Sequence, residues 1–413
     1  MNDKVQRQYD IVVAGGGMIG SSLALALAPL GLKLAVVEAV ARTESTQPSF
    51  DDRSTALSRS TQKMFQAMGL WPEIVAASTP IRRIHVSERG RFGFSHIDAT
   101  EQGVEALGYV VINRVLGGVL QKAMREVGAL DLLCPAAITD VDIDREQVNV
   151  HVEHDDASSA WLSARLLVAA DGAASSVRSM MGIAAQRSEY GQRAIVGNLM
   201  PEQPIDHRAY ERFTERGPIA LLPVADGRAA FVWIVSESDA QALLTLDDDN
   251  FVAALQDEFG FRLGRFSKIG RRASYPLALS KASRLTVRRG VVVGNSAHGL
   301  HPVAAQGFNL GMRDVAALCD CLADAQAGTS FDPGDAAILT RYAQWRRGDQ
   351  ARLVGITDGL VRLFGSRRGP ARLLRNVGML GFDFVPGVRS LFARQMMGLT
   401  GRLPRLSRGV PIR

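Results

Sequence analysis

Cysteine is scarce in this sequence: Cys134, Cys319 and Cys321 are its three cysteines in 413 residues. An odd, sparse set excludes a disulfide framework and is typical of reduced thiols in the cytosol. Cys319 and Cys321 are two positions apart, which is not the CxxC spacing of a redox or zinc site. The seven histidines form no ligand cluster, so the sequence does not predict a metal site.

A membrane-spanning run is also missing. Residues 11–32 carry no charged side chain, and an apolar stretch of that length resembles a signal peptide or a membrane span. However, Gly15, Gly16 and Gly17 interrupt the run, and the residues before it are mixed in charge. We therefore expect a cytoplasmic protein.

Acidic residues are rare at the C-terminal end. Residues 341–413 hold fifteen arginines, no lysine and three acids, a charge of +12, whereas the 340 residues before them carry −6. A basic tail suits nucleic acid or an anionic membrane surface. Apolar residues among the arginines from Leu360 to Phe392 fit an interfacial helix on the inner membrane, and they fit helices packed on the core equally well. We predict contact with the membrane surface or a protein complex, and no nucleic acid.

The remaining composition is that of a globular enzyme, with 46% hydrophobic and 22% charged residues. A length of 413 residues exceeds what one core usually reaches, which predicts two domains. Neither repeats nor low-complexity segments occur.

The first motif is a strand–helix–strand unit near the N-terminus. Its pattern predicts a strand over 9–14, a helix over 18–30 and a strand over 33–38. Gly15, Gly17 and Gly20 form the GxGxxG fingerprint between strand and helix, and Glu38 ends the second strand. The glycines permit a tight turn and close approach to a pyrophosphate, and the acid is placed to accept hydrogen bonds from a ribose. The alternative is a glycine-rich turn without a ligand.

The second motif is a strand–turn–helix at 291–314, VVVGNSAHGLHPVAAQGFNLGMRD. Gly307 begins the predicted helix, whose N-terminus presents free N–H groups and a positive dipole end. That end stabilises a group that becomes negative on reduction. The segment resembles the second flavin signature of the FAD-dependent aromatic hydroxylases. A strand ending in Asp171-Gly172 resembles their middle signature, and the three signatures follow the order and spacing of the family.

Further segments are similar to the branch of this family that hydroxylates 2-polyprenyl-6-methoxyphenol on the way to ubiquinone. They are FDxRxxAL from Phe50, ERFTERGPIALLPVADGR from Glu211, SYPLAL, GFNLGMRD and GITDGLVRLF. Two positions depart from the usual pattern: Asn295 stands where the broader family has Asp, although this branch also tolerates Asn, and Ala305 replaces a Gly before Gln306. The second departure puts the local turn, and therefore the detailed flavin contacts, in question.

The resemblance implies a residue set for each role. For FAD it gives Gly15, Gly17, Met18, Ile19, Gly20, Glu38, Arg53, Arg114, Asp171, Gly172, Gly294, Asn295, Ala305, Gln306, Gly307, Phe308 and Asn309. The candidates on the substrate side are Arg53, Tyr210, Phe213, Pro302 and Phe308. Arg114 is also compatible with a solvated surface charge, and the aromatic candidates with an ordinary core.

The implied reaction is ring hydroxylation of a polyprenyl phenol. NAD(P)H binds transiently and reduces FAD, O₂ adds to give a C4a-hydroperoxyflavin, and the electron-rich ring attacks its distal oxygen. The alternatives are another ring hydroxylase of the pathway or family, an epoxidase that shares the FAD fold, and a non-catalytic flavoprotein subunit of a ubiquinone-synthesis complex. A halogenase is disfavoured because the WxWxIP motif is missing.

The expected fold is α/β, a Rossmann-like FAD-binding domain with an inserted antiparallel-sheet substrate domain and a C-terminal helical tail. The FAD-binding parts are predicted at 1–80, 111–188 and 285–350, the substrate parts at 81–110 and 189–284, and the tail at 351–413. Ala56, Leu57, Met64 and Phe65 keep helical spacing, which predicts one amphipathic helix through this segment.

Overall fold

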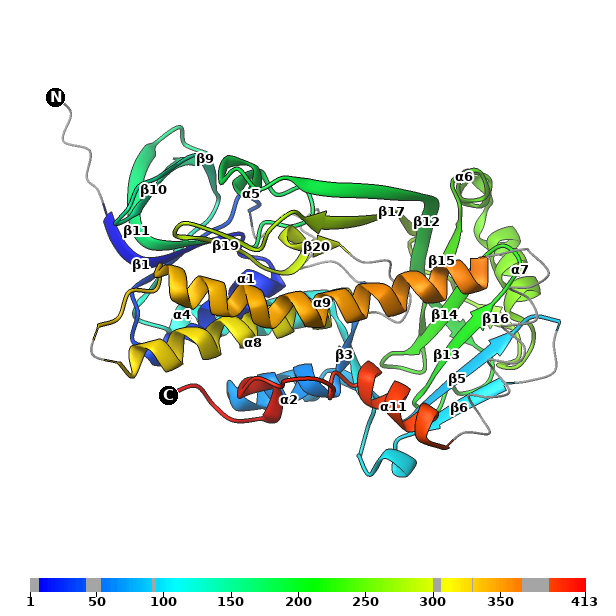
Figure 1. Cartoon of the computed structure of the whole chain (residues 1–413). Coiled ribbons are helices and arrows are strands. Elements are labelled where there is room, and N and C mark those ends of the chain that lie inside the picture. Colours follow the sequence, from blue (N-terminus) through cyan, green and yellow to red (C-terminus); the bar gives the residue numbers. More distant parts are fainter. Residues whose placement is uncertain (1–6, 42–52, 91–93, 300–305, 329, 366–385) are drawn as a thin grey trace.

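The structure is a computed structural model that describes residues 7–41, 53–90, 94–299, 306–328, 330–365 and 386–413. One part is a layered α/β assembly around the N-terminal strand, and the other is a large, mainly antiparallel sheet (Figure 1). Two long strands, β12 (Ala185–Pro201) and β17 (Ala273–Ala282), run from the first part into the second. The predicted α/β class with an inserted antiparallel sheet is confirmed.

The first sheet has the order β18-β19-β11-β1-β2-β8, and β19, β11, β1, β2 and β8 are mutually parallel. The strand β10 pairs antiparallel with β11, and β9 pairs antiparallel with β10 in the same sheet. Its members are β1 (Arg7–Ala14), β2 (Leu34–Val37), β8 (Leu130–Leu133), β9 (Ala136–Ile143), β10 (Val148–His154), β11 (Ser159–Ala169), β18 (Thr286–Val287) and β19 (Gly290–Val292). The strands β2 and β19 are wholly apolar, and so is the second half of β1 from Ile11 to Ala14, as parallel strands covered on both faces must be.

Helices cover one face of this sheet: α1 (Met18–Leu27), α4 (Asn113–Glu126), α8 (Gly307–Gln326) and α9 (Ala336–Gly365). Their apolar sides form one buried cluster with the strands, which includes Leu23, Leu116, Leu318 and Tyr342. The other face packs against β9, β10 and the short helix α5 (Ser176–Met180). No helix in the described part of the chain is long and apolar enough to cross a membrane.

The second sheet has the order β20-β17-β12-β15-β14-β13-β5-β6. All neighbours are antiparallel except β13 and β5, which are parallel. Besides β12 and β17 it contains β5 (Arg83–Glu88), β6 (Phe94–Asp98), β13 (Arg208–Phe213), β14 (Pro218–Pro223), β15 (Ala229–Ser236) and β20 (His298–Gly299), with β16 (Phe266–Ser267) beside β12. Strands β5 and β6, from the predicted substrate part at 81–110, therefore join the strands of the part predicted at 189–284 in one sheet.

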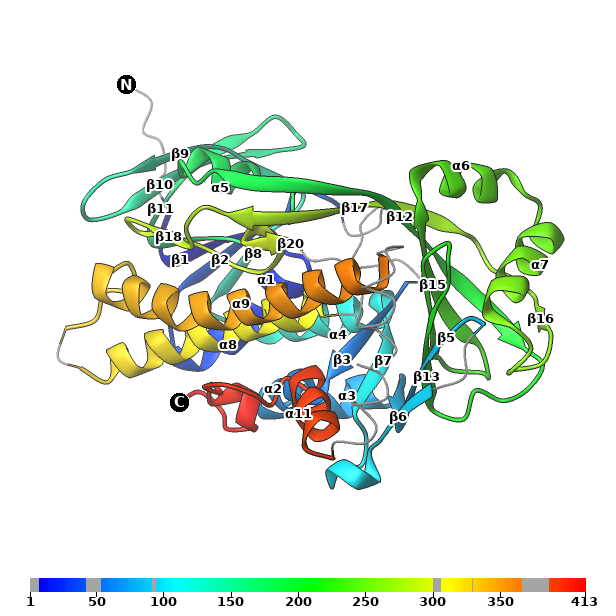
Figure 2. The ribbon, with the colours of Figure 1, turned by 45° about the vertical axis from the view of Figure 1, so that its right-hand side comes forward.

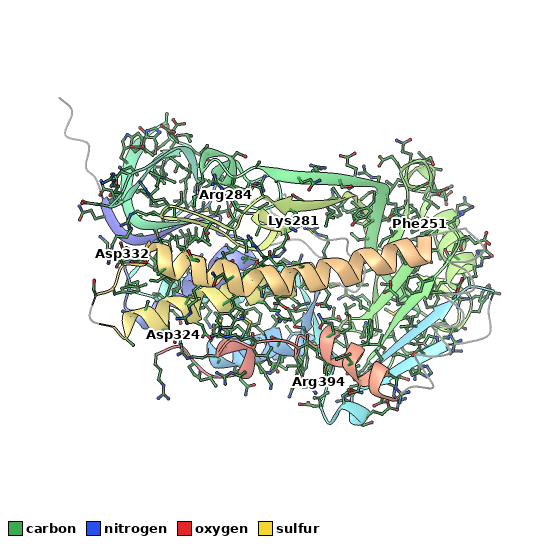
Figure 3. The ribbon with its side chains drawn as sticks, in the orientation of Figure 1. Phe251, Lys281, Arg284, Asp324, Asp332 and Arg394 are labelled. Atoms are coloured by element: carbon green, nitrogen blue, oxygen red, sulfur yellow. The ribbon has the colours of Figure 1, made fainter. Side chains whose placement is uncertain are left out.

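Two helices seal the outer face of the second sheet: α6 (Glu237–Thr245) and α7 (Asp248–Phe259) (Figure 2). Phe251 of α7, labelled in Figure 3, contacts Phe231 and Trp233 with ring centroids 5.9 and 5.8 Å away. Each helix begins at a capping side chain, Ser236 for α6 and Asp247 for α7. This outer layer has its own apolar core.

A small third sheet has the strand order β3-β7-β4. Along the chain, its strands come where the backbone passes between the first and the second sheet. It consists of β3 (Ser54–Ser58), β4 (Ser78–Ile81) and β7 (Gly108–Ile112). The helices α2 (Arg59–Ala67) and α3 (Trp71–Val75) connect β3 to β4. The prediction of a helix through Ala56 and Leu57 was wrong: both lie in β3. Ser58 ends the strand and caps α2 by accepting a hydrogen bond from the Thr61 N–H, so helical spacing across this junction was coincidental.

The described end of the basic tail packs on the protein. Helix α11 (Pro386–Met396) contributes Ala393 to a buried cluster, and Leu406 and Ile412 lie in the core shared by α1 and α8. Arg389 pairs with Glu101 at 3.0 Å. For residues 386–413 this arrangement agrees with core-packed helices rather than an interfacial tail; residues 366–385 lie outside the described part.

Candidate active site

The carboxyl ends of four parallel strands meet at one edge of the first sheet. Residues 15–20 follow β1, Glu38 follows β2, Asp171 follows β11, and Gly294 follows β19. The three sequence motifs therefore converge on one edge. Ligands of open α/β sheets bind outside the carboxyl ends of the strands, so this edge is the candidate site.

The fingerprint glycines make contacts that no larger residue tolerates. Gly15 has φ +96°, and a Cβ there would lie 2.7 Å from the Ala170 carbonyl oxygen. A Cβ on Gly20 would lie 1.8 Å from the Gly15 carbonyl oxygen. The glycines thus bring the first turn of α1 against the end of β11, which is the close packing that the fingerprint predicts.

Glu38 is fixed beside the N-terminus of α1. Its half-buried carboxylate accepts hydrogen bonds from the backbone N–H groups of Gly16, at 2.7 Å, and Val40, at 2.9 Å. Helix α1 begins at Met18, and its N-cap position, Gly17, makes no side-chain cap hydrogen bond. The start of α1 therefore suits an anion. The Ile19 side chain packs against Gly294 and Gly311 instead. An uncapped helix start next to an oriented acid fits a dinucleotide.

Asp171 organises the loop after β11. Its carboxylate accepts hydrogen bonds from the Ser175 hydroxyl, the Ser296 hydroxyl at 3.1 Å and the Val177 N–H at 3.2 Å. The Gly172 N–H donates to the Ser296 hydroxyl at 3.1 Å. The middle signature is therefore bonded directly to the turn after β19.

That turn presents Asn295 to the surface. Gly294 has φ +59° and opens a short 3₁₀ segment, Gly294–Ser296, in which Asn295 is exposed between buried neighbours. The Gly294 N–H donates to the Asp314 carboxylate at 3.0 Å. The side chain at the strand end thus points away from the core, and the backbone below it is anchored to α8.

Asp314 anchors the turn after β19, and the sequence patterns did not predict this role. It is fully buried and accepts hydrogen bonds from His298 Nε2 and Arg346 Nε, each at 2.6 Å, and from Gln350 Nε2 at 3.2 Å. Burial alone would raise its pKa, but the charges of His298 and Arg346 outweigh burial and lower the pKa to about 2. A carboxylate on the apolar face of a predicted helix is the signal that would have identified it.

Helix α8 begins at Gly307, as predicted, with Gln306 as its N-cap position. Phe308 packs partly buried against the core of the first sheet. The Asn309 side chain ties α8 to β3 and α2: its oxygen accepts from the Ser58 N–H and the Thr61 hydroxyl, and its amide donates to Ala56. The candidates Pro302 and Ala305 lie outside the described residues.

Two arginines predicted to bind FAD belong to other elements. The Arg53 guanidinium lies over the Tyr275 ring, 4.5 Å from its centroid, and so connects the start of β3 to β17 of the second sheet. Arg114 is exposed in the first turn of α4. Arg53 is thus at the junction of the two parts, and Arg114 lies outside the apolar core.

The two aromatic candidates of β13 lie on opposite faces of the second sheet, because they are three residues apart in a strand. Tyr210 is buried under α7, with its ring centroid 5.8 Å from that of Phe259. This corrects the expectation that Tyr210 lines the substrate side. Phe213 shares the other face with Ala209 and Glu211.

That other face turns toward the first part of the molecule. Ala209 and Leu222 pack there with Ala56 of β3 and Val110 of β7. Farther along the sheet the face is only half-buried. We call it the inner face; its half-buried members include Val86, Val196, Glu211, Ala220, Leu222 and Val232.

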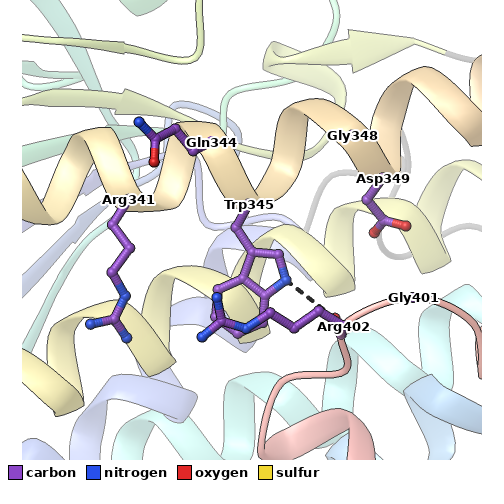
Figure 4. A pocket seen from close by; sticks show the side chains of 7 residues that line it. All are labelled: Arg341, Gln344, Trp345, Gly348, Asp349, Gly401 and Arg402. Atoms are coloured by element: carbon purple, nitrogen blue, oxygen red, sulfur yellow. Dashed lines mark hydrogen bonds between the residues drawn. The ribbon is translucent and has the colours of Figure 1, made fainter.

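A cavity of about 370 Å³ lies elsewhere, between α9 and the C-terminal segment. Figure 4 shows Trp345 at its centre with Arg402, whose guanidinium lies 4.0 Å from the indole centroid and whose carbonyl accepts the Trp345 N–H. Arg341, also in its wall, pairs with Asp324. The two arginine side chains of this cavity wall, Arg341 and Arg402, therefore already interact with other groups of the protein.

Comparisons with known proteins agree with this site. A family model described as an FAD binding domain matches residues 8–355. A ubiquinone hydroxylase of Rhodospirillum rubrum is 37% identical over 409 residues, 98% of this chain and 93% of that protein. The 3-demethoxyubiquinol 3-hydroxylase of Escherichia coli is 29% identical over 401 residues, 94% of this chain and 98% of that protein.

Among solved structures, the p-nitrophenol 4-monooxygenase of Pseudomonas putida has a TM-score of 0.78 at 16% identity, covering 96% of this chain and 100% of that chain. The predicted FAD cofactor and enzyme class are confirmed by the family match and the relatives. The chain therefore belongs to the FAD-binding-domain family, as an FAD-dependent aromatic-ring monooxygenase.

Proposed function

We propose that this enzyme hydroxylates the aromatic ring of a polyprenylated methoxyphenol in ubiquinone biosynthesis, with NAD(P)H as transient reductant and O₂ as oxidant. The observation that carries the proposal is the inner face of the second sheet. It is lined by Val86, Val196, Ala220 and Val232, and its half-burial contrasts with the sealed outer face under α6 and α7. The relatives named as ubiquinone hydroxylases support the same assignment.

The chain's own residues would position FAD at the edge of the first sheet. Glu38 would accept hydrogen bonds from the adenosine ribose, and the N-terminus of α1 would receive the pyrophosphate. Asp171, Asn295 and the N-terminal turn of α8 would hold the flavin end. When bound, FAD supplies the reduction of O₂ to an oxygen-transferring form. The positive end of the α8 dipole stabilises negative charge on the reduced ring.

The inner face has two tasks in this reaction. Its aliphatic side chains exclude water from the oxygen-transferring site, so that reductant is not lost to peroxide. The same side chains bury the prenyl chain, and each buried CH₂ contributes about 0.8 kcal/mol to binding. Arg53, which joins β3 to β17, keeps the inner face in register with the flavin edge.

Steady-state assays with 2-prenyl-6-methoxyphenols of increasing chain length test the proposal. We expect slow NAD(P)H oxidation by the enzyme alone, a rise when the phenol is added, and a ring-hydroxylated product. KM should fall as the chain lengthens. Stimulated oxidation that yields only peroxide would contradict the substrate assignment, and FAD binding without any phenol-dependent oxidation would favour a non-catalytic flavoprotein subunit.

A further inference from the structure

Glu211 is a carboxylate in the middle of the apolar inner face. It lies on β13 with Ala220 of β14 on one side and Val86 of β5 on the other. The row continues through Val232 to Val196, and every one of these neighbours is apolar. Alternation in the strand sends Arg212 to the opposite face, where it donates to the Glu258 carbonyl at 3.3 Å.

No hydrogen bond or ion pair within the described part of the chain satisfies the Glu211 carboxylate. Glu88, at the end of β5 beside Phe213, is the other titratable group of β13 and its neighbour strands on this face. Burial among apolar neighbours raises the pKa of Glu211 to about 7. Desolvating a carboxyl group without a partner is costly, and such groups concentrate at functional sites.

The position of Glu211 connects it to the flavin edge. Ala209, two residues earlier on the same face, belongs to an apolar cluster against which Ala56 of β3 packs. The Ala56 carbonyl accepts the Asn309 amide of α8 at 2.9 Å. Glu211 therefore lies about 7 Å along the strand from a member of the cluster that adjoins the first turn of α8.

We propose that Glu211 is the base that removes the proton from the ring hydroxyl of the bound phenol; this inference rests on the proposed function. The phenol O–H bond breaks, its electron pair stays on the phenolate oxygen, and the proton forms the carboxylic acid of Glu211. The phenolate pushes electron density to its ortho and para ring carbons, which raises their reactivity toward the oxygen supplied at the flavin. Because Glu211 is half-buried, the acid returns its proton to solvent after turnover.

The test compares wild type with Glu211→Gln, which preserves size and removes the base. Because the ionised form must accept the proton, wild-type kcat should rise with pH through about 7 and then level off. Glu211→Gln should lower kcat at pH 8 by 10²–10⁴-fold, abolish that inflection and leave activity to rise with the phenol's own ionisation, near pH 10. A nitrated phenol, ionised without a base, should restore hydroxylation by the variant. Glu211→Asp should keep part of the activity and the inflection.

Matched controls separate this role from a structural one. Glu215→Gln removes an exposed carboxylate four residues away in the β13–β14 turn and should leave kcat and its pH profile unchanged. Glu211→Gln should retain FAD. It should also unfold no more easily than wild type above pH 7, because a raised carboxyl pKa makes the ionised form a cost to stability there.

The outcomes also distinguish the inference from the proposed function. Wild-type hydroxylation with an unchanged profile in Glu211→Gln would overturn the role of Glu211 and leave the function standing. If wild type hydroxylates no phenol, the ionisation of a bound nitrated phenol, read from its absorbance against pH, decides alone. Two coupled ionisation steps in wild type that become a single step in Glu211→Gln support proton exchange between the phenol and Glu211; the same single step in both proteins rejects it.

Discussion

Replacing Asp314 by Asn should destabilise the whole enzyme because it discharges the centre of a buried ion network. Asp314 and Arg346 are 0% and 1% exposed as side chains, and their atoms approach to 2.6 Å. Asp349 remains as a second partner of Arg346, which limits the loss. Breaking one side of a buried pair typically costs about 3–5 kcal/mol, and the effect of Asp314→Asn should lie in that range.

The pH dependence of unfolding gives an independent estimate. The folded pKa of Asp314 is about 2 against an ordinary value of 3.8, which corresponds to roughly 2–3 kcal/mol. Because the folded value is depressed, this stability is present above pH 4 and is lost as pH falls from about 4 to 2. Asp314→Asn should remove this part of the acid sensitivity.

Urea unfolding of the apoprotein, followed by far-UV circular dichroism, measures both effects without the contribution of bound flavin. Asp324→Asn is the matched control: Asp324 is on the same helix (Figure 3) but is 32% exposed, and it pairs with Arg341 and Arg405 at the surface. Surface pairs contribute about 0.2–1 kcal/mol each. Equal losses in the two variants would refute the argument that burial of Asp314 sets the magnitude.

Three further predictions concern the cofactor, the helix packing and the tail. Glu38→Ala should weaken FAD binding by about 1.5–3 kcal/mol, the worth of charge-assisted hydrogen bonds, measured by fluorescence titration of the apoprotein; unchanged affinity would reject the ribose contact. Gly311→Ala should cost about 1–3 kcal/mol in urea unfolding because its Cβ would lie 2.8 Å from Ile19 Cδ1. Gly118→Ala, with open space in α4, should instead stabilise by roughly 0.5–1 kcal/mol. If the basic tail from Leu360 to Arg413 contacts lipid, vesicle binding should need anionic lipid and fall with salt; equal binding to neutral and anionic vesicles, or none to either, would contradict this.

The flavin edge was predictable because its signals are local. The glycines at 15–20 and the acid at 38 are positioned by one strand–helix–strand unit, so spacing alone places them. The start of α8 at Gly307 follows from the change from turn residues to helical periodicity. Their convergence at one edge then follows from the parallel pairing of β1, β2, β11 and β19.

The substrate side was less predictable because it depends on pairings between distant segments. The strand β3 forms only by pairing with β7, more than fifty residues later, and its short alternation reads equally well as the start of α2. Tyr210 was assigned to the wrong face for a similar reason: which side of β13 is sealed depends on α7, which the periodicity of β13 does not reveal. Glu211 could have been found as the acid between Ala209 and Phe213, the apolar residues at the alternate positions of its strand.

The most direct test of the central claim is the source of the new oxygen atom. Wild-type enzyme, NAD(P)H and a 2-prenyl-6-methoxyphenol are incubated under ¹⁸O₂, and the product is examined by mass spectrometry. The account predicts one ¹⁸O atom in the ring-hydroxylated product. A hydroxylated product that carries only unlabelled oxygen would show that water supplies the atom and would contradict monooxygenation.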